Sequence, residues 1–391
     1  MNKKMKKFLG LSFCTVLSLA LVLGMQSCKD DDPVDTGSEK EEVLAAALPQ
    51  YVNNTVVTTY KGMADEADLL NKALVALQTS KTDANVKAAA DHWLKSRKYW
   101  ELSEAFLYGA ASDFGIDPHI DTWPLAKDEL LAELANDSHI ASMAGEDGDA
   151  WAGEYLGNGL LGYHGIEYIL FKDGETKSAS EISDKELIYA VAVSGDLRNQ
   201  CFRLEASWAG IDNVSEDKQA KLEDLELGIL MNDRISYGEN MLRAGKAGST
   251  YITIVDACEA IIEGCITIAD EVAAMKIGKP HTGEDVNYIE SPYSYNSKID
   301  FEDNIESIRN AYTGGPLTNN QEVASVRSYI KSANASLDTE LINAIDDAVA
   351  KIKAIPYPFA QNYTSSQAGA AVAACNNLVD VLTKVKVELT K

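Results

Sequence analysis

The sequence predicts an all-α protein built from two helical bundles. Apolar residues recur at alternating spacings of three and four over long stretches, which is the period of an amphipathic helix. Two long irregular segments interrupt these stretches, one in each half of the chain. The clearest helical stripe consists of Ile254, Cys258, Ile261, Cys265, Ile268, Val272 and Met275.

The first 27 residues have the three zones of an export signal. Four lysines precede an apolar run over 8–25, and Ser27 stands before Cys28. The run lies at the lower limit of membrane-spanning length, and strong polarity follows at once. We therefore expect cleavage before Cys28 and lipid attachment to it, with an acidic tether over 28–45. A cleaved soluble secretory protein is the alternative.

The tether also bears on location. Its opening residues, Lys-Asp-Asp-Asp over 29–32, resemble the surface-export signal of Bacteroidetes lipoproteins. The expected location is the outer membrane, at the cell surface, with the membrane as a partner through the lipid on Cys28.

Charge limits the possible ligands. The formal net charge is −25, and removal of residues 1–27 takes away four lysines and no acid, leaving −29. Nucleic acid and anionic lipid would be repelled by such a chain. The charge suits capture of cations, but acidity that serves only solubility remains open.

The first bundle is expected over 46–210 and the second over 211–391, separated by the polar segment 209–216. Residues 53–60 are rich in Val and Thr and would suit a strand, yet no second strand-like run offers a partner, so a helix is expected. Further helical stripes are Val193, Leu197, Cys201, Leu204 and Trp208; Ile342, Ile345, Val349 and Ile352; and Cys375, Val379, Leu382, Val385 and Leu389.

Two segments, 109–124 and 278–300, are rich in residues that break helices and are expected to be structured loops. Cysteines give no sign of a disulfide. Cys258 and Cys265 lie seven residues apart on a helix, or about 10.5 Å, which is too far for a disulfide bond. The sequence has no C-x-x-C pair, so a zinc site made of cysteine thiolates is not expected.

The segment most suggestive of chemistry is GNGLLGYHGIEYILF over 157–171. His164 and Glu167 are three residues apart, so on a helix both side chains leave the same face and reach one ion together. Gly157, Gly159, Gly162 and Gly165 crowd this helix, which suggests close approach of another backbone or a ligand. Tight packing around a satisfied core histidine would explain the same pattern.

A second acidic group precedes this segment. Glu104 stands among Leu102, Ala105, Phe106 and Leu107, where an isolated carboxylate would be costly to bury, so it is expected to be paired or to be a ligand. Glu101, one turn earlier, could equally face solvent. His119 and Asp121 follow in the next loop. Asp117, which begins this loop, suits a turn-forming role.

These residues carry a resemblance to a known family. Gly162-x-His164-x-x-Glu167, continuing to Phe171, is similar to the signature of the imelysin family. So are WELSEAFLYG over 100–109 and IDTWP over 120–124. A later block, SPYSYN over 291–296 through Asp300, Asn304 and Tyr312-Thr-Gly314, is also similar. The resemblance covers nearly the whole chain after the tether, in the family's order, and implies two α-helical bundles with a pocket between them.

What the resemblance implies about activity is divided. The family was classed as insulin-cleaving-type metallopeptidases, and it is also associated with bacterial iron uptake. Carried onto this chain, it implies a metal site of His164, Glu167, Glu104 and Asp121. Gly162, Ser294, Arg234 and Arg309 would be pocket neighbours, and iron-transport components would be partners.

Three functions remain to be weighed. A zinc peptidase needs three protein ligands and a general base, and the third ligand would have to come from His281 in a loop without a motif. Binding of a divalent or ferric ion requires only one imidazole and several carboxylates, without a general base, and iron or zinc would fit such a site. A non-catalytic module for a small molecule or haem is the third, with Tyr163 or Tyr168 as an axial ligand. We prefer metal binding linked to iron uptake.

Overall fold

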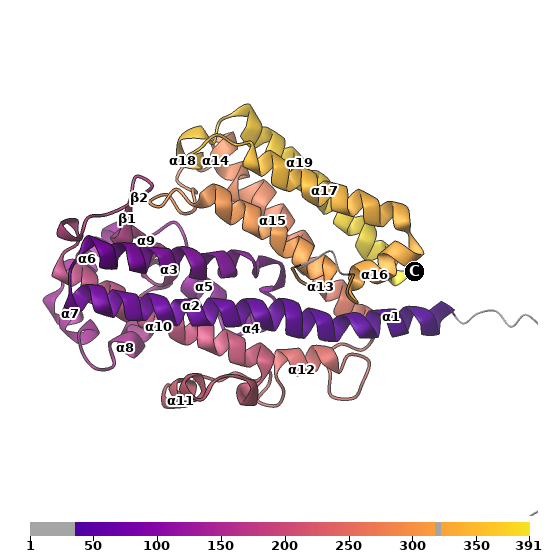
Figure 1. Ribbon diagram of the computed structural model, residues 1–391, viewed down its shortest axis with the longest axis horizontal. Coiled ribbons are helices and arrows are strands. Elements are labelled where there is room, and N and C mark those ends of the chain that lie inside the picture. The colour runs from indigo at the N-terminus through magenta and orange to yellow at the C-terminus, as the bar shows by residue number, and fades with distance from the viewer. Residues whose placement is uncertain (1–35, 317–321) are drawn as a thin grey trace, which may run out of the picture. The chain divides into compact units, whose positions relative to one another are not determined.

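The computed structural model describes residues 36–316 and 322–391 (Figure 1). In these ranges the regular structure is helical apart from one small antiparallel hairpin, β1 (Phe171–Lys172) and β2 (Glu175–Thr176), and one isolated bridge between Met231 and Ile235. The all-α prediction is confirmed. Residues Gly37–Lys391 form one compact unit. No helix in the described part of the chain is long and apolar enough to cross a membrane.

The predicted signal segment 1–27 and Cys28 lie outside the described residues. Helix α1 (Thr36–Gln50) begins within the segment 28–45 that was expected to be a tether. Its Leu44 and Leu48 are buried in the core, because a spacing of four places both on one face of the helix. The folded body therefore starts earlier than the sequence predicted.

The first group of helices surrounds α2, which packs against both α3 and α10. Short helices connect these long ones, two of them inside the segment 109–124 that was expected to be a loop. The long members are α2 (Val57–Thr79), α3 (Asp83–Glu101), α9 (Gly162–Leu170) and α10 (Asp184–Ala209). The short ones are η2 (Glu104–Phe106), α4 (Ala110–Asp113), α5 (Ile116–Ile120), α6 (Lys127–Ala135), α7 (Asp137–Met143), α8 (Gly148–Tyr155), η3 (Asn158–Leu160) and η4 (Ala179–Glu181).

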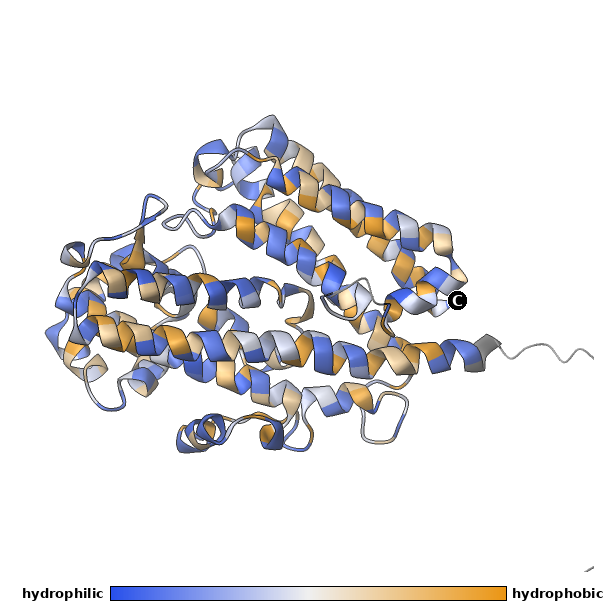
Figure 2. Cartoon of the chain, viewed as in Figure 1, coloured by the Kyte–Doolittle hydropathy of each residue, from blue (hydrophilic) through white to orange (hydrophobic). Residues whose placement is uncertain are grey.

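In the second group, four long helices pack in a ring, each against two others. They are α13 (Ile254–Glu271), α15 (Ser297–Thr313), α17 (Ala335–Lys353) and α19 (Ser366–Thr390). Shorter helices complete the group: α14 (Gly278–Thr282), α16 (Val326–Ala333) and α18 (Phe359–Asn362). Figure 2 shows hydrophobic residues recurring along these helices between hydrophilic ones, as the stripes in the sequence require.

The segment between the groups differs from the expected boundary at 210/211. After η5 (Ile211–Asn213), helices α11 (Glu216–Asp224) and α12 (Tyr237–Leu242) still pack against α10 of the first group. By its packing, the second group begins with α13. The polar sequence 209–216 thus marks a turn rather than the change from one group to the other.

Two π-helical turns interrupt the regular helices. The first, η1 (Tyr51–Val56), lies in the Val- and Thr-rich segment that was expected to be helical, and it leads directly into α2. The second, η6 (Val272–Lys276), continues α13 and ends at Lys276, whose side chain is buried. Such turns widen a helix by one residue and often occur at functional sites.

The two groups meet where α3 and η2 pack against α13 and α15. The contact is close: a Cβ atom on Gly264 of α13 would collide with the Ala105 carbonyl of η2. The Ala105 amide donates to the Ser307 hydroxyl of α15, 3.1 Å away. The four cysteines after Cys28 are buried and free, so the expected absence of disulfides holds for the described residues.

Candidate metal centre

Charged side chains are buried where the two helix groups meet. Arg97 and Glu101 come from α3, and Glu104 begins η2. Asp121 directly follows α5, and Lys276 ends η6. Glu290 lies in the segment before α15, and Asp300 lies in the first turn of α15. These seven residues, called the acid-rich cluster below, are all at most 9 % exposed.

Arg97 is the centre of the cluster and is completely buried. Its Nη1 donates to Asp121 Oδ1. Its Nη2 lies 2.5 Å from Glu290 Oε1 and 2.6 Å from Glu101 Oε1. Its Nε lies 3.9 Å from Asp300 Oδ2 and has no hydrogen-bond partner. One guanidinium therefore serves four carboxylates.

Lys276 is the second cation. Its Nζ lies 3.2 Å from Glu290 Oε1, 3.3 Å from Glu104 Oε1 and 3.6 Å from Glu101 Oε2. Glu104, predicted to be paired or a ligand, is thus paired with a lysine of the second helix group. Glu101, for which a solvent-facing position was left open, is completely buried.

Negative charge exceeds positive charge in the cluster, because two cations face five carboxylates. Burial raises the pKa of Glu101, Glu104 and Glu290 above the ordinary value. Unpaired charge is costly to bury, so such a cluster must hold protons or accept a further cation. It has the composition of a cation site.

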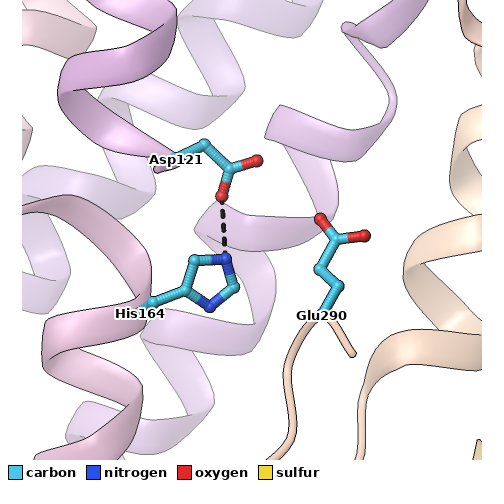
Figure 3. Close-up of side chains that lie close together, drawn as sticks. All are labelled: Asp121, His164 and Glu290. Carbon is cyan, nitrogen blue, oxygen red and sulfur yellow. Dashed lines mark ion pairs between the residues drawn. The ribbon is translucent and has the colours of Figure 1, made fainter. Parts of the chain in front are cut away.

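His164 adjoins the cluster and is 2 % exposed. Its Nδ1 lies 3.2 Å from Glu167 Oε2, and its Nε2 lies 3.2 Å from Asp121 Oδ1 (Figure 3). Burial alone would lower the pKa of His164, but the Asp121 and Glu167 carboxylates outweigh it and raise the pKa to about 9. The imidazole therefore takes a proton readily and is placed between two acids.

Glu167 orients the imidazole. Its Oε1 accepts three hydrogen bonds, from the Tyr293 amide at 3.0 Å and from the Ser294 amide and hydroxyl, each at 2.8 Å. Its other oxygen faces His164 Nδ1. Since both oxygens are engaged, Glu167 positions His164 and leaves Nε2 as the nitrogen that points into the cluster.

Two glycines of the motif explain how these residues approach one another. Gly162 has φ +70, and a Cβ atom there would collide with the Ile120 carbonyl. Glycine thus lets the start of α9 contact the backbone just before Asp121. At Gly165 the Tyr189 hydroxyl fills the space of a Cβ atom. At these two glycines, the group that approaches closely is therefore another part of the protein and not a ligand.

The residues fit a metal ion. Asp121, His164 and Glu290 each offer one donor atom, all within 4.8 Å of one another. In Figure 3 the three side chains converge from separate segments. Glu290 Oε2 is buried and has no hydrogen-bond partner, and His164 Nε2 has only its ion-pair contact with Asp121. Arg97 occupies Asp121 Oδ1 and Glu290 Oε1, so Glu290 Oε2 is left for an ion.

A small cavity of about 120 Å³ leads to His164. Its other lining residues come from the segment after α5 and from the segment before α15: Trp123, Pro124, Leu125, Asn287, Ile289, Pro292 and Tyr293. It lies between the two halves of the sequence, where the predicted pocket was expected. We call it the His164 pocket.

Most of the predicted site residues come together here. His164, Glu167, Asp121, Gly162 and Ser294 share one network, and Glu104 joins it through Lys276.

Two arginines and one histidine do not. Arg309 pairs with Glu306 and Asp346, each 2.8 Å away. Arg234 lines a separate cavity of about 410 Å³ together with Arg243. His281 Nδ1 lies 2.8 Å from the Tyr363 carbonyl, so its place as a third zinc ligand is not supported. Arg309 is partly buried on α15, and Arg234 lies within the tight turn 231–235, so neither lines the His164 pocket.

Sequence reasoning missed Arg97, Lys276 and Glu290. Arg97 precedes Glu101 by four residues, a spacing typical of a helical ion pair, and this was the available signal. Glu290 lies in the segment 278–300, which was noted only as an irregular loop. Lys276 lies four residues after Val272, so helical spacing places it on the buried face of the α13 stripe, but a lysine there was not considered as a site residue.

The geometry also separates the three functions considered from the sequence. Glu167 is held by Tyr293 and Ser294, so the motif does not supply a histidine and glutamate pair of zinc ligands. The His164 pocket is much smaller than the roughly 300 Å³ at which sites for drug-sized ligands begin, so it does not suit haem. Metal binding through His164 Nε2 agrees best with the contacts.

Known proteins share this architecture. The iron-regulated protein A of Synechococcus elongatus is 26% identical over 336 residues, which cover 86% of this chain and 83% of that protein. A crystal structure from Parabacteroides distasonis, assigned as an iron-regulated protein A precursor, is 28% identical with a TM-score of 0.75; the match covers 89% of this chain and 95% of that one. An imelysin-like protein from Psychrobacter arcticum, 15% identical, shares the fold with a TM-score of 0.56 over 89% of this chain and 93% of its own.

The sequence pattern of one family, described as Imelysin, matches residues 56–385. The match includes every member of the acid-rich cluster, His164 and Glu167. The chain belongs to the imelysin family.

Proposed function

We propose that this protein binds a metal ion through His164 Nε2, Asp121 and Glu290, and that it does so as an exported lipoprotein taking part in iron acquisition. One observation carries the proposal. Three donors from separate segments converge within 4.8 Å. Buried Glu290 Oε2 has no hydrogen-bond partner, and His164 Nε2 has only its ion-pair contact with Asp121 Oδ1 at 3.2 Å. Buried polar atoms are normally paired, so an orphaned atom at such a point indicates a missing ligand.

The donor types indicate the class of ion. One imidazole with two carboxylates suits a divalent or ferric ion such as iron, manganese or zinc. The two relatives that carry the name iron-regulated protein A favour iron among these. In this proposal Glu167 fixes the imidazole, and Arg97 holds the carboxylates in place until the ion arrives.

Location completes the proposal. The expected lipid on Cys28 would tether the body to the outer membrane, at the cell surface, where an ion can be captured before transport. Iron-transport components would then be the partners that receive it. Mass spectrometry of the mature N-terminus would test the anchor. A diacylated Cys28 in the wild type and a soluble Cys28→Ser variant are expected, and an unmodified mature N-terminus would contradict it.

The test of the site is calorimetric titration of the mature protein with Mn²⁺, Zn²⁺ and Fe²⁺, together with metal analysis. His164→Ala and Glu290→Gln should each weaken binding at least about tenfold, since each removes a ligand or its charge. The matched control is His92→Ala, because His92 Nδ1 also lies 2.7 Å from a carboxylate, that of Glu66, which is not a member of the acid-rich cluster.

The control variant should bind metal as the wild type does. Unchanged affinity and metal content in both His164→Ala and Glu290→Gln would overturn the proposal. Glu167→Gln separates positioning from coordination: it should shift the pH dependence of binding, whereas Glu290→Gln should weaken binding at every pH.

A further inference from the structure

A second cavity, formed by the segment 231–250, takes no part in the proposed metal site. Its volume is about 410 Å³, within the range of roughly 300–1,000 Å³ that is usual for sites of small molecules. It shares no lining residue with the His164 pocket. We call it the arginine pocket. Its lining residues are Met231, Asn232, Arg234, Ile235, Glu239, Arg243, Gly248, Ser249 and Thr250.

Arg234 differs from the other arginines of the chain. The sequence has seven arginines, and each of the other six donates at least one side-chain hydrogen bond to another residue. The Arg234 guanidinium has neither a hydrogen bond nor an ion pair with any residue of the described ranges, although acids outnumber lysines and arginines by 60 to 35. A permanently charged group is thus left without a protein partner at the wall of a cavity.

Arg243 supplies a second guanidinium and is held in place. Its Nη2 donates to the Ala247 carbonyl at 2.9 Å, and its Nη1 lies 3.4 Å from Glu239 Oε1. Gly248 has φ +94, and a Cβ atom there would lie 3.4 Å from Arg243 Nη2, so glycine lets the loop pass close to the guanidinium. Glu239 is the one acid that lines the cavity. Together with Arg234 and Arg243 it leaves a formal charge of +1, in a chain whose net charge is −25.

Thr250 adds a hydroxyl donor. Its amide donates to Asn240 Oδ1 at 2.8 Å, and its Oγ1 accepts a hydrogen bond from Asn240 Nδ2 at 2.9 Å. Asn240 is buried, so it holds Thr250 from the protein side. Because Oγ1 accepts in this contact, the hydroxyl proton remains available for a ligand.

The backbone fixes the other wall of the cavity. Asn232 and Asp233 have φ of 52 and 56, the left-handed conformation that these residue types tolerate better than most. The Met231 amide donates to the Ile235 carbonyl at 2.9 Å and closes the turn. The turn thereby places Met231, Arg234 and Ile235 on one cavity wall, with two apolar side chains beside the guanidinium.

These groups define the chemistry of a ligand. The guanidinium groups and the Thr250 hydroxyl offer hydrogen-bond donors, and a guanidinium matches the two oxygens of a carboxylate. Met231 and Ile235 suit a short carbon skeleton. We propose that the arginine pocket binds a small organic dicarboxylate, with one carboxylate at Arg234 and the other at Arg243 and Thr250. This inference goes beyond the proposed metal site and does not rest on it.

Succinate is the probe that tests the proposal, because it consists of two carboxylates on a short apolar chain. Succinamide is its neutral counterpart, propionate has one carboxylate, and inorganic phosphate is an anion without a carbon skeleton. Calorimetric titration of the mature protein at low salt should show succinate binding at least about tenfold more tightly than each of the other three. Equal binding of any of the three would overturn the proposal.

Arg234→Gln should weaken succinate binding at least about tenfold, and Arg234→Lys should bind with intermediate affinity, because lysine keeps the charge and loses the planar fork. Since Arg234 has no partner in the described residues, neither change should move the urea midpoint. Thr250→Val should weaken binding roughly three- to tenfold.

The matched control is Arg309→Gln, which removes the same charge from a guanidinium that is paired with Glu306 and Asp346. This variant should bind succinate as the wild type does. An equal loss in Arg234→Gln and Arg309→Gln would show that succinate responds only to net charge, and the proposal would fail.

A further variant separates the arginine pocket from the metal site. His164→Ala should leave the affinity for succinate unchanged, because His164 does not line the arginine pocket. Loss of succinate binding in His164→Ala, with binding retained in Arg234→Gln, would place the anion at the other site and contradict this inference.

Discussion

Two clusters of charge in this protein each bury a lysine and a glutamate, and yet they differ in balance and in exposure, since the side chains of Lys61 and Asp65 in the first are 58% and 46% exposed. In the first, Lys218 of α11 lies 2.6 Å from both Asp65 of α2 and Glu205 of α10, and Lys61 also contacts Asp65. Two cations thus meet two acids, and none of these side chains has an unpartnered buried atom in the described structure. We call it the balanced cluster.

The acid-rich cluster has two cations for five acids, and Arg97 Nε and Glu290 Oε2 lack hydrogen-bond partners. The balanced cluster joins three helices and requires nothing further. The comparison teaches that a buried ion pair is not by itself evidence of a site. A binding site is indicated instead by an excess of one charge together with buried polar atoms that lack a partner.

The largest expected effect is that of Arg97→Met. Loss of the guanidinium leaves Lys276 alone among five buried carboxylates, so we expect the free energy of unfolding to fall by about 3–5 kcal/mol. The matched change in the balanced cluster, Lys218→Met, should cost about 1–2 kcal/mol. Urea unfolding measures both.

Added Mn²⁺ should recover more stability in Arg97→Met than in Lys218→Met, since a ligand that binds only the folded state stabilises it. If both variants lost the same stability and responded alike to metal, the two clusters would be equivalent and the comparison would fail.

The next effect concerns pH. Folded His164 keeps its proton to about pH 9, whereas an unfolded histidine loses it near pH 6.5. Between these values the folded state holds more protons, so stability falls as pH rises, by roughly 3 kcal/mol over the window. His164→Gln should flatten the slope between pH 6.5 and 9. Bound metal should flatten it too, because the ion takes the place of the proton.

Urea midpoints at several pH values check this expectation. His119, which pairs with Asp196 at 2.8 Å, offers a control variant, His119→Gln. A slope that persists in His164→Gln would show that His164 is not the proton-binding group.

The smallest of the three effects sharpens how the acid-rich cluster is assembled. Gly162→Ala introduces a side chain at φ +70 against the Ile120 carbonyl, and should cost about 1–3 kcal/mol and weaken Mn²⁺ binding by moving Asp121. Gly157→Ala is the control, because no atom lies within 4 Å of its added Cβ, and should change stability by less than about 0.5 kcal/mol. Equal effects of both substitutions would show that α9 and Asp121 are not coupled through this contact.

Much of the fold could be predicted from the sequence because the spacing of apolar residues over a few turns indicates a helix and its buried face. The stripe of α13 buries Cys258, Ile261, Cys265 and Ile268 as its spacing requires. The boundary between the helix groups could not be predicted this way. The boundary depends on whether α11 and α12 pack against α10 or against α13, and the sequence of these short helices does not indicate which.

The candidate site, like the fold, could be predicted only in part. His164 and Glu167 were singled out because one helical turn places them together among crowded glycines, and the resemblance to the imelysin family added Glu104 and Asp121 to the expected site. Their roles were not evident, since Glu167 is engaged by Tyr293 and Ser294, which lie more than a hundred residues away in the chain.

By itself the sequence determined the helical class, the buried faces of the helices and the residues of the H-x-x-E motif, because each of these follows from spacing over a few residues. Only the tertiary structure decided which carboxylates share Arg97, that Lys276 faces inward, and that Glu290 completes a set of donors with His164 and Asp121. The reason is physical: the balance of buried charge depends on groups brought together from distant segments, and that balance exists only once the helices have packed.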